Sequence, residues 1–288
     1  MKLKNTYEGA VNAQYAELME YVAECGEESL DRTEVGTYSV FGNNTVAFPL
    51  WYTEEYGAKL PIISTKKVHI PSVVHELLWM ISGSTNIKYL VDNKVSIWNA
   101  WADENGELGP VYGAQWRNFN GEGVDQIKQL EHALRTNPKS RRHILTAWNP
   151  AQLSKMALPP CHAFAQFYVD NSNNLHCQLY QRSADLFLGV PFNILQYSLL
   201  TAMLARVCGY GLGRFTHIFG DLHIYKNHID QAHQLIERNF VERDDRVAYE
   251  TPLLKLPKRD SITEYTYADF EWVGEYIHGA HISALVAV

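Results

Sequence analysis

The sequence predicts a single α+β domain. Its 288 residues are 46% hydrophobic and 20% charged, which is typical of a globular chain that buries a substantial core. Segments with a helical spacing of apolar residues alternate with segments of strand-like composition. No repeat, low-complexity stretch or linker divides the chain, so we expect residues 1–288 to form one unit.

Helical and strand signals alternate through the N-terminal half. The apolar stripe that begins at Tyr7 predicts a helix ending at Gly26, and Asn137-Pro138 ends the last helix of this half. Residues Gly42-Asn43-Asn44 are a good hairpin turn. The expected elements are a helix over 7–26, two short strands within 37–50, a helix over 72–83 after Pro71, and a helix over 124–136.

The C-terminal half begins with strands rich in β-branched and aromatic residues. Two of them flank the segment 170–174, a loop of turn-forming residues. Val190-Pro191 opens the most hydrophobic helix of the chain. The expected elements are strands over 142–148, 163–169 and 175–182, a helix over 190–208, a strand over 214–219 and a helix over 227–238.

Composition excludes several classes of protein. The N-terminus has no basic stretch followed by an apolar core, and no apolar run approaches the roughly 20 residues of a membrane helix. Four scattered cysteines without a CxxC pair argue against a zinc site and a disulfide framework. A net charge of −7 offers nucleic acid no attractive field. We therefore expect a cytoplasmic protein that binds no metal, membrane or specific nucleic acid.

Cys161, in the run Leu158-Pro159-Pro160-Cys161-His162, is the best single clue to function. A thiol becomes a strong nucleophile only as the thiolate, which a nearby cation favours. The segment 181–185 supplies an arginine, a hydroxyl and a carboxylate twenty residues later. If the two segments meet, Arg182 is placed to activate the thiol. The alternative is that Cys161 is a small buried hydrophobe.

Arginines in apolar surroundings indicate a bound anion. Arg141-Arg142 and Arg182 stand in otherwise apolar or aromatic segments, where an unpaired cation is costly. A structural ion pair explains any one of them, but several in one chain favour a phosphate ligand.

Motifs in the same order along nearly the whole chain resemble the thymidylate synthase family. They are His75-Glu76-Leu77-Leu78-Trp79, Ser96-Ile97-Trp98, Trp101-Ala102-Asp103-Glu104-Asn105-Gly106, Leu108-Gly109-Pro110-Val111-Tyr112-Gly113, Ser140-Arg141-Arg142, Ala157-Leu158-Pro159-Pro160-Cys161-His162, Cys177 to Asp185, and Phe187 to Asn193. The resemblance implies a large twisted mixed β-sheet flanked by helices, and a homodimer that associates through its sheet faces.

The resemblance also implies a reaction, the transfer of one carbon from 5,10-methylenetetrahydrofolate to C5 of dUMP, giving dTMP and dihydrofolate. Cys161 would add to uracil C6 and so make C5 nucleophilic. Glu76 would organise the proton transfers, and its apolar neighbours predict a raised pKa. The implied catalytic residues are Cys161, Glu76, Tyr112, His162, Asn193 and Arg182.

Two sets of ligand-binding residues follow from the same resemblance. Arg141 and Arg142 would reach the phosphate from the partner subunit, and adjacent arginines cannot both face inward on one strand. The implied dUMP-binding residues are Arg32, Arg141, Arg142, Gln181, Arg182, Ser183, Asp185, Asn193, His223 and Tyr225. The implied folate-binding residues are Ile97, Trp98, Trp101, Leu158, Asp185, Gly189, Phe192 and the C-terminal residues, including Ala287.

The chain departs from the family pattern at three places. Arg-Thr-Gly-Thr-Gly-Thr is here Arg32-Thr33-Glu34-Val35-Gly36-Thr37, and Trp-Asp-Glu-Trp is Trp98-Asn99-Ala100-Trp101. The C-terminal tail lacks three prolines of the family pattern, which predicts a higher ordering cost when it closes.

Three other functions compete with this interpretation. A dUMP 5-hydroxymethyltransferase shares every step but the last, where water replaces hydride, and Trp98 and Tyr112 argue against it by screening the reacting carbon. An inactive relative that binds nucleotide or RNA would not need Cys161, Glu76 and Asn193 together. A cysteine hydrolase would leave the phosphate residues without a role.

Overall fold

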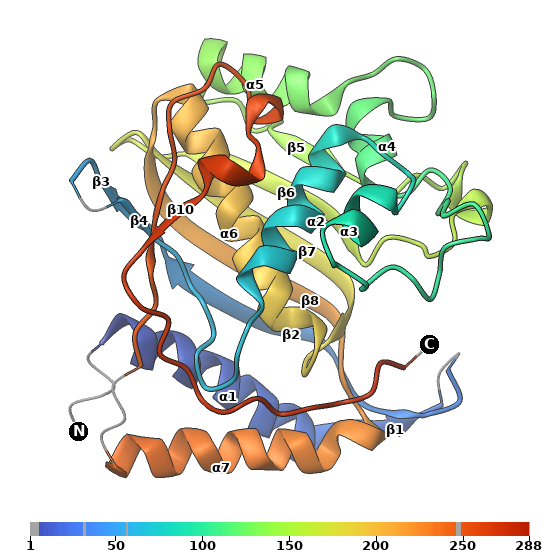
Figure 1. The fold of residues 1–288 in the computed structure, drawn as a ribbon, viewed down its shortest axis with the longest axis vertical. Helices are drawn as coiled ribbons and strands as arrows, with labels where there is room; N and C mark the ends of the chain where they lie inside the picture. Colours follow the sequence, from blue (N-terminus) through green and yellow to red (C-terminus); the bar gives the residue numbers. More distant parts are fainter. Residues whose placement is uncertain (1–5, 31–32, 56, 246–248, 288) are drawn as a thin grey trace.

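The largest element is a six-stranded mixed sheet. The structure, a computed structural model, describes residues 6–30, 33–55, 57–245 and 249–287. Strands β7 and β8 are parallel and every other neighbouring pair is antiparallel. The strand order is β1 (Glu27–Ser29), β2 (Thr37–Pro49), β8 (Gly211–Tyr225), β7 (Asn174–Asp185), β6 (His162–Val169) and β5 (Ile144–Thr146). This mixed sheet flanked by helices confirms the predicted α+β class (Figure 1).

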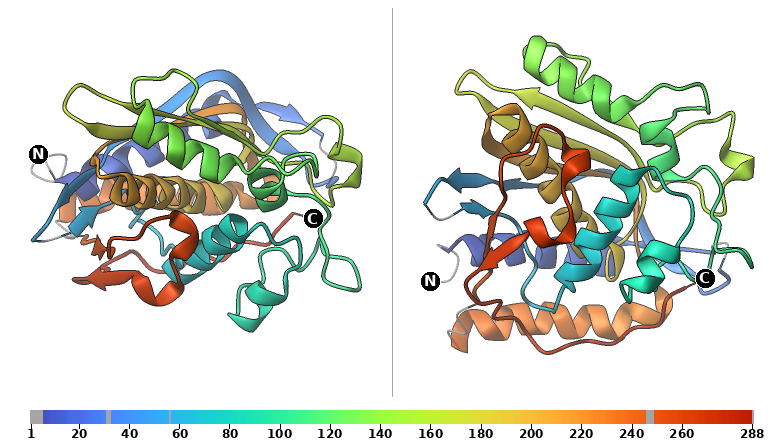
Figure 2. Two further views of the ribbon diagram at one scale, coloured as in Figure 1. Left: turned by 90° about the horizontal axis from the view of Figure 1, so that it is seen from above. Right: turned by 45° about the horizontal axis from the view of Figure 1, so that its top comes forward.

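Helix α6 (Gly189–Cys208) is the crossover between the two parallel strands and packs on both of them. Helix α2 (Ile70–Ser82) packs on α6 from the side away from the sheet, so sheet, α6 and α2 form successive layers (Figure 2). Since α6 carries apolar residues all round, burial on both sides is the arrangement its sequence requires. Its hydroxyls Ser198 and Thr201 donate back to carbonyls four residues earlier, which satisfies them inside the core.

The remaining elements surround these layers. Helix α1 (Tyr7–Cys25) lies beside α7 (Ile229–Asp245) and also contacts β2 (Figure 1). A second, four-stranded sheet has the order β10 (Glu271–Val273), β9 (Leu253–Lys255), β4 (Gly57–Lys59) and β3 (Trp51–Thr53). The other helices are α3 (Lys88–Asp92), α4 (Tyr112–Arg117) and α5 (Gln126–Thr136), with 3₁₀ turns η2 (Leu153–Lys155), η3 (Lys226–His228), η4 (Ile262–Glu264) and η5 (Tyr267–Asp269).

The face of the six-stranded sheet opposite α6 carries a continuous row of large side chains. The register places Phe164 opposite Tyr180, and Tyr180 beside Ile218 on the parallel neighbour. Tyr168 is 51% exposed and Ile144 is 46% exposed on this face. We call this the open face, and its residues include Thr45, Ala47, Ile144, Phe164, Gln166, Tyr168, His176, Gln178, Tyr180, Thr216 and Ile218.

The long helices and the 163–182 hairpin expected from the sequence are confirmed. Helix α1 begins after Thr6, whose side chain accepts from the Gly9 N–H, and is followed by Gly26. Helix α2 has Pro71 in its first turn and ends before Gly83, which adopts the left-handed conformation at φ +80°. Helix α6 likewise ends before Gly209.

The hairpin predicted within 37–50 is wrong. Residues 37–49 form the one strand β2, which pairs with β8 along its whole length. Between Phe41 and Asn44 the register shifts by one residue, and Gly42 takes φ +71° there. The turn-forming residues therefore make a β-bulge, because β8 is long enough to pair with the residues on both sides of them.

Other boundaries differ at the short elements. The strand expected over 142–148 is reduced to β5, while the strand expected over 214–219 extends through the whole of β8. Helix α7 begins only after the turn η3. The three-residue strands β1, β3, β4, β9 and β10 were not predicted, because so few residues carry no periodic signal. In the described part of the chain, no helix combines the length and apolarity needed to cross a membrane.

We predict that Gly113→Ala destabilises the fold by about 3 kcal/mol, because a Cβ there would collide with the Met80 carbonyl where α4 crosses α2. Gly123→Ala is the control, since its Cβ would meet open space and only its φ of +81° is unfavourable, for a loss of about 1 kcal/mol. Urea unfolding measures both. Equal losses would contradict a tight α2–α4 crossing.

Candidate active site

The segments that carry Cys161 and Arg182 meet in the structure. Cys161 is partly exposed in the loop that enters β6, and its carbonyl accepts the Arg182 backbone N–H at 2.9 Å. The Arg182 side chain donates from Nε to the Pro160 carbonyl and from Nη2 to the Pro159 carbonyl, each at 2.8 Å. Its guanidinium also lies 5.3 Å from the Trp148 ring centroid. The guanidinium of Arg182 therefore fixes the proline loop that carries the thiol.

Tyr112 and His162 enclose the other side of the Cys161 loop. The Cys161 backbone N–H donates to the Tyr112 hydroxyl at 2.8 Å. The buried His162 ring lies 5.4 Å from the Tyr112 ring and 5.2 Å from that of Tyr197. Burial lowers the pKa of His162 to about 4, and its hydrogen bond with Asn193 opposes that shift. A neutral His162 is a weak base near pH 7, which disfavours a cysteine hydrolase.

Glu76 is a buried carboxyl held by two donors. On α2, its Oε1 accepts from Trp98 Nε1 at 2.8 Å and its Oε2 accepts from Gln196 Nε2 at 2.9 Å. Burial raises the pKa of Glu76 to about 7, against the lowering effect of these two hydrogen bonds. The raised pKa expected from the apolar neighbours of Glu76 is thus present in the structure.

The turn between β7 and α6 brings the polar residues of 185–193 together. Asp185 Oδ1 accepts the backbone N–H groups of Phe187 and Leu188, both at 3.0 Å. A Cβ on Gly189 would lie 3.6 Å from Asn193 Oδ1, so the glycine brings the start of α6 close to this amide. The sequence analysis missed Lys66, whose ammonium donates to the Phe187 carbonyl at 2.6 Å. Burial lowers the pKa of Lys66 to about 8.

His223 and Tyr225 project from the same side of β8, with ring centroids 5.1 Å apart. His223 pairs in register with Asp185 on β7, which brings the β8 residues to the turn just described. Asp221, also missed by the sequence analysis, shares a hydrogen bond of 2.7 Å with His223 Nδ1 and accepts from Ser39 Oγ. This contact leaves His223 Nε2 as the nitrogen turned away from Asp221.

The remaining expected dUMP residues occupy different environments. Gln181 is buried, and its amide contacts His217 Nε2 at 2.8 Å and donates to the Ser183 carbonyl at 3.0 Å. Arg141 and Arg142 lie exposed on the bend before β5, and neither makes an ion pair with a described residue. Arg32 lies outside the described residues.

The expected folate residues include an aromatic wall beside Glu76. The Trp98 ring lies 6.0 Å from that of Trp101 and 5.8 Å from that of Tyr112. Trp101 Nε1 is buried without a hydrogen-bond partner among the described residues. Leu158 and Phe192 pack against the same core, and Ile97 is 38% exposed. An aromatic wall with one unsatisfied donor fits a flat heteroaromatic ligand.

The C-terminal tail is anchored along α7. Arg238 Nη1 donates to the carbonyls of Ala280 and Thr65, at 2.7 and 2.8 Å. His228 Nε2 lies 2.6 Å from the Leu285 carbonyl, and Ile282 is buried. Ala287 is half-buried. The tail holds this path without the three missing prolines.

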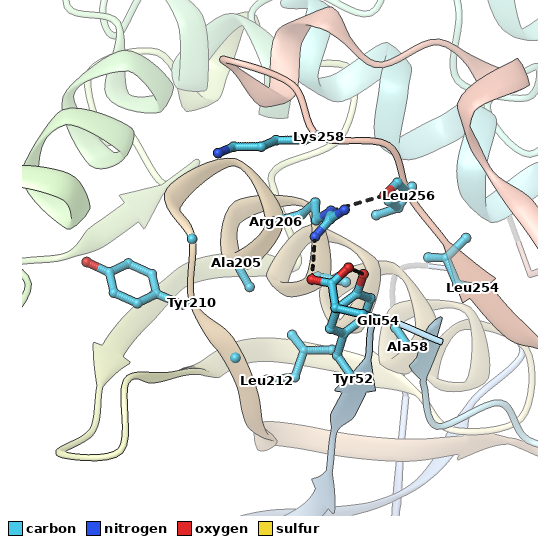
Figure 3. A pocket seen from close by; sticks show the side chains of 13 residues that line it. Tyr52, Glu54, Ala58, Ala205, Arg206, Tyr210, Leu212, Leu254, Leu256 and Lys258 are labelled. Atoms are coloured by element: carbon cyan, nitrogen blue, oxygen red, sulfur yellow. Dashed lines mark hydrogen bonds and ion pairs between the residues drawn. The ribbon is translucent and has the colours of Figure 1, made fainter. Parts of the chain in front are cut away.

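A separate cavity of about 430 Å³ lies at the far end of α6 (Figure 3). Its central cation, Arg206, pairs with Glu54 at 3.1 Å and donates to the Leu256 carbonyl at 3.1 Å. The guanidinium also lies over the Tyr52 ring. The charge of Arg206 is therefore already compensated, and none of the expected site residues lines this cavity.

Comparison with known proteins gives concordant results. A family model described as thymidylate synthase matches residues 13–288. A thymidylate synthase of Francisella philomiragia is 48% identical over 289 aligned residues, which cover 96% of this chain and 99% of the relative.

We predict that Glu76→Gln stabilises the fold at pH 8. Burial raises the pKa of Glu76 from 4.5 to about 7, so the unfolded chain loses this proton first and stability falls as pH rises between those values. The substitution removes that loss, for a gain of about 3 kcal/mol at pH 8 that fades towards pH 4.5. Urea unfolding at pH 5 and 8 measures the difference. A gain equal at both pH values would exclude Glu76 titration as its cause.

Proposed function

The chain belongs to the thymidylate synthase family, and we propose that the site around Cys161 carries the family's reaction. The reaction is the transfer of one carbon from 5,10-methylenetetrahydrofolate to C5 of dUMP with reduction, giving dTMP and dihydrofolate. The observation that carries the proposal is a chain of contacts from the nucleophile's loop to the buried acid. The Tyr112 hydroxyl accepts the Cys161 backbone N–H, the Tyr112 ring lies against Trp98, and the Trp98 indole donates to the buried carboxyl of Glu76.

Cys161 acts as the nucleophile in this proposal. Its sulfur bonds to C6 of the uracil ring, and the C5–C6 π electrons move towards the C4 oxygen, which makes C5 nucleophilic. The backbone bonds of Cys161 to Tyr112 and Arg182 support this role, because they fix the approach of the thiol.

Glu76 accepts and donates the protons that move during the reaction. The C5 proton must leave during the reaction, and an acid must assist the departing amine. A carboxyl whose pKa is about 7 both accepts and releases a proton near neutral pH, which suits it to both duties through an intervening water.

Asn193 reads the base. Its amide offers one donor and one acceptor, which matches the N3–H and O4 edge of uracil and not the corresponding edge of cytosine. The hydrogen bond of Asn193 with the neutral His162 supports a fixed orientation of this amide. His223 and Tyr225, from the same side of β8, hold the ribose 3′-hydroxyl.

The phosphate is held by cations from two subunits. Arg182 and Ser183 contribute from one subunit, with Arg32, and Arg141 and Arg142 cross from its partner. The exposure of Arg141 and Arg142, without ion pairs to described residues, supports a contact outside their own chain.

We place the dimer contact on the open face. Phe164, Tyr168 and Tyr180 place aromatic side chains on this face, and Ile144 and Tyr168 are exposed there. Contiguous apolar surface of this kind is typical of a protein–protein contact. A two-fold contact would cover the same face on both copies. The bend with Arg141 and Arg142 precedes β5, the edge strand of this face.

The folate lies against Trp98 and Trp101. The aromatic wall and the unsatisfied indole N–H of Trp101 fit its pterin ring, and Asp185, Gly189 and Phe192 border the same region in the proposal. When bound, methylenetetrahydrofolate supplies both the carbon and the hydride. Trp98, Tyr112 and the docked tail exclude water, which disfavours hydroxymethylation.

We also propose a reducing compartment such as the cytoplasm. The four cysteines lie apart without forming a disulfide, and the nucleophile must remain a thiol.

We predict that Cys161→Ser abolishes turnover while dUMP binding and the fold persist, since a hydroxyl is a far weaker nucleophile at neutral pH. Mass spectrometry of the product formed from dUMP and methylenetetrahydrofolate measures turnover and separates methyl from hydroxymethyl products. Calorimetric titration with dUMP is the binding control. Substantial methyl transfer by the variant would remove Cys161 from the mechanism.

We predict that two inactive chains complement one another. In a mixed dimer of Cys161→Ser and Arg142→Glu chains, one site receives Cys161 from one chain and Arg142 from the other, while the second site carries both defects. Activity should return to at most about half of wild type per mixed dimer. Pull-down with two tags must first establish subunit exchange. Mixed dimers without activity would place Arg142 in its own subunit's site or outside any site.

A further inference from the structure

We propose that Gln196 is a positioning residue whose side-chain amide rotates by a half-turn when Glu76 gains or loses its proton. The proposal rests on the proposed role of Glu76 in proton transfer and extends it. It assigns to one amide the task of holding the carboxyl in place in both states.

Gln196 is 1% exposed on α6 and faces Glu76 across the α2–α6 contact. Its Nε2 donates to Glu76 Oε2 at 2.9 Å and lies 3.8 Å from Met80 Sδ. On the other side, Trp98 Nε1 donates to Glu76 Oε1 at 2.8 Å. Each of the two carboxyl oxygens therefore accepts a hydrogen bond from a different segment of the chain.

The unsatisfied atom of Gln196 points to a second arrangement. Its Oε1 is buried without a hydrogen-bond partner among the described residues. A buried amide oxygen left alone is unfavourable, whereas the N–H donor beside it suits an ionised Glu76, because both carboxylate oxygens then accept from the donors that face them. The present arrangement therefore corresponds to the carboxylate form.

Protonation of Glu76 reverses the requirement. The indole of Trp98 can only donate, so Oε1 must remain an acceptor and the proton is held on Oε2, facing Gln196. A half-turn about the last side-chain bond of Gln196 replaces its N–H by its Oε1, which then accepts the new O–H. The terminal torsion of glutamine is broad and roughly two-fold, so both arrangements are accessible.

The titratable groups that face Glu76 keep their charge near pH 7, while Lys66, at the turn after β7, has a pKa of about 8. Tyr112 of α4 and Tyr197 of α6 interact with its charge, and burial raises the pKa of both well above the usual value for tyrosine. His162, which contacts both tyrosines, has a pKa of about 4. His75, beside Glu76 on α2, stacks on Tyr267 instead. Trp98 and Trp101, from the remaining segment, do not titrate.

Replacing the amide of Gln196 by a thioether of similar length shows which form of Glu76, the neutral acid or the carboxylate, the amide stabilises more. In Gln196→Met the neutral acid loses one acceptor, but the carboxylate loses a charge-assisted donor, which is the larger effect. The pKa of Glu76 should therefore rise further.

The experiment is a pH profile of kcat/KM for wild type, Gln196→Met and the matched control Ser198→Ala. Ser198 is buried on the same helix and bonds only to the Ile194 carbonyl among the described contacts. In Gln196→Met, we expect the limb of the pH profile that reports the ionisation of Glu76 to shift by about one unit towards higher pH. The limb should not move in Ser198→Ala, and dUMP affinity should persist in both. An unmoved limb in Gln196→Met overturns the proposal.

A second comparison separates positioning from support of the fold. In a Glu76→Gln background, Gln196→Met should cause little further loss of the residual rate, because the group it acts through is gone. If Gln196→Met lowered the rate by the same factor in both backgrounds, its role would be structural and the proposal would be overturned. If Gln196→Met does not fold, Gln196→Glu replaces it. Its second carboxyl beside Glu76 should move the limb up by more than one unit, and no movement overturns the proposal.

Failure of this proposal is distinguishable from failure of the proposed function. Wild-type activity in Glu76→Gln would remove Glu76 from the proton transfers. An inactive Glu76→Gln together with an unmoved limb in Gln196→Met would reject only the role of Gln196.

Discussion

Burial of α6 on both sides is the constraint on which the site depends. A helix with apolar residues all round must be covered by the sheet on one side and by α2 on the other. That double contact brings Asn193 near His162 and Gln196 against Glu76, from elements far apart in the sequence. The position of Glu76, the proposed proton-transfer group, is thus a consequence of core packing.

The same burial destabilises the fold locally. A carboxyl removed from water resists ionisation, and two hydrogen bonds only partly offset the effect, so the pKa of Glu76 stays near 7. A well-packed apolar residue would be more stable at this position. The buried carboxyl destabilises the fold, and the stability of the surrounding core offsets that effect.

Sequence reasoning succeeded where a signal was local and long. The apolar stripes of α1, α2 and α6 and the turn residues at 170–174 predicted those elements. The motifs around Cys161 and Arg182 were found in the sequence, but only the fold shows that the two segments meet. Sequence reasoning failed at 42–44, where turn-forming residues make a bulge because β8 is long enough to pair with both halves. It also missed Gln196, although a polar residue three positions after Asn193 on an apolar helix was a usable signal. Lys66 and Asp221 could not be found, because only the folded chain shows which buried groups need their hydrogen bonds.

The two faces of the large sheet have different consequences. One face buries α6 and is complete within a single chain, whereas the open face leaves aromatic side chains in solvent. If a second copy covers that face, the contact that removes the aromatics from water also brings Arg141 and Arg142 to the other subunit's phosphate. Stability and phosphate binding then both depend on association, so dilution should weaken them together. A monomer of this chain would keep the Cys161 thiol, the Glu76 carboxyl and the Asn193 amide, but it would lack the arginines that we propose its partner contributes to the phosphate.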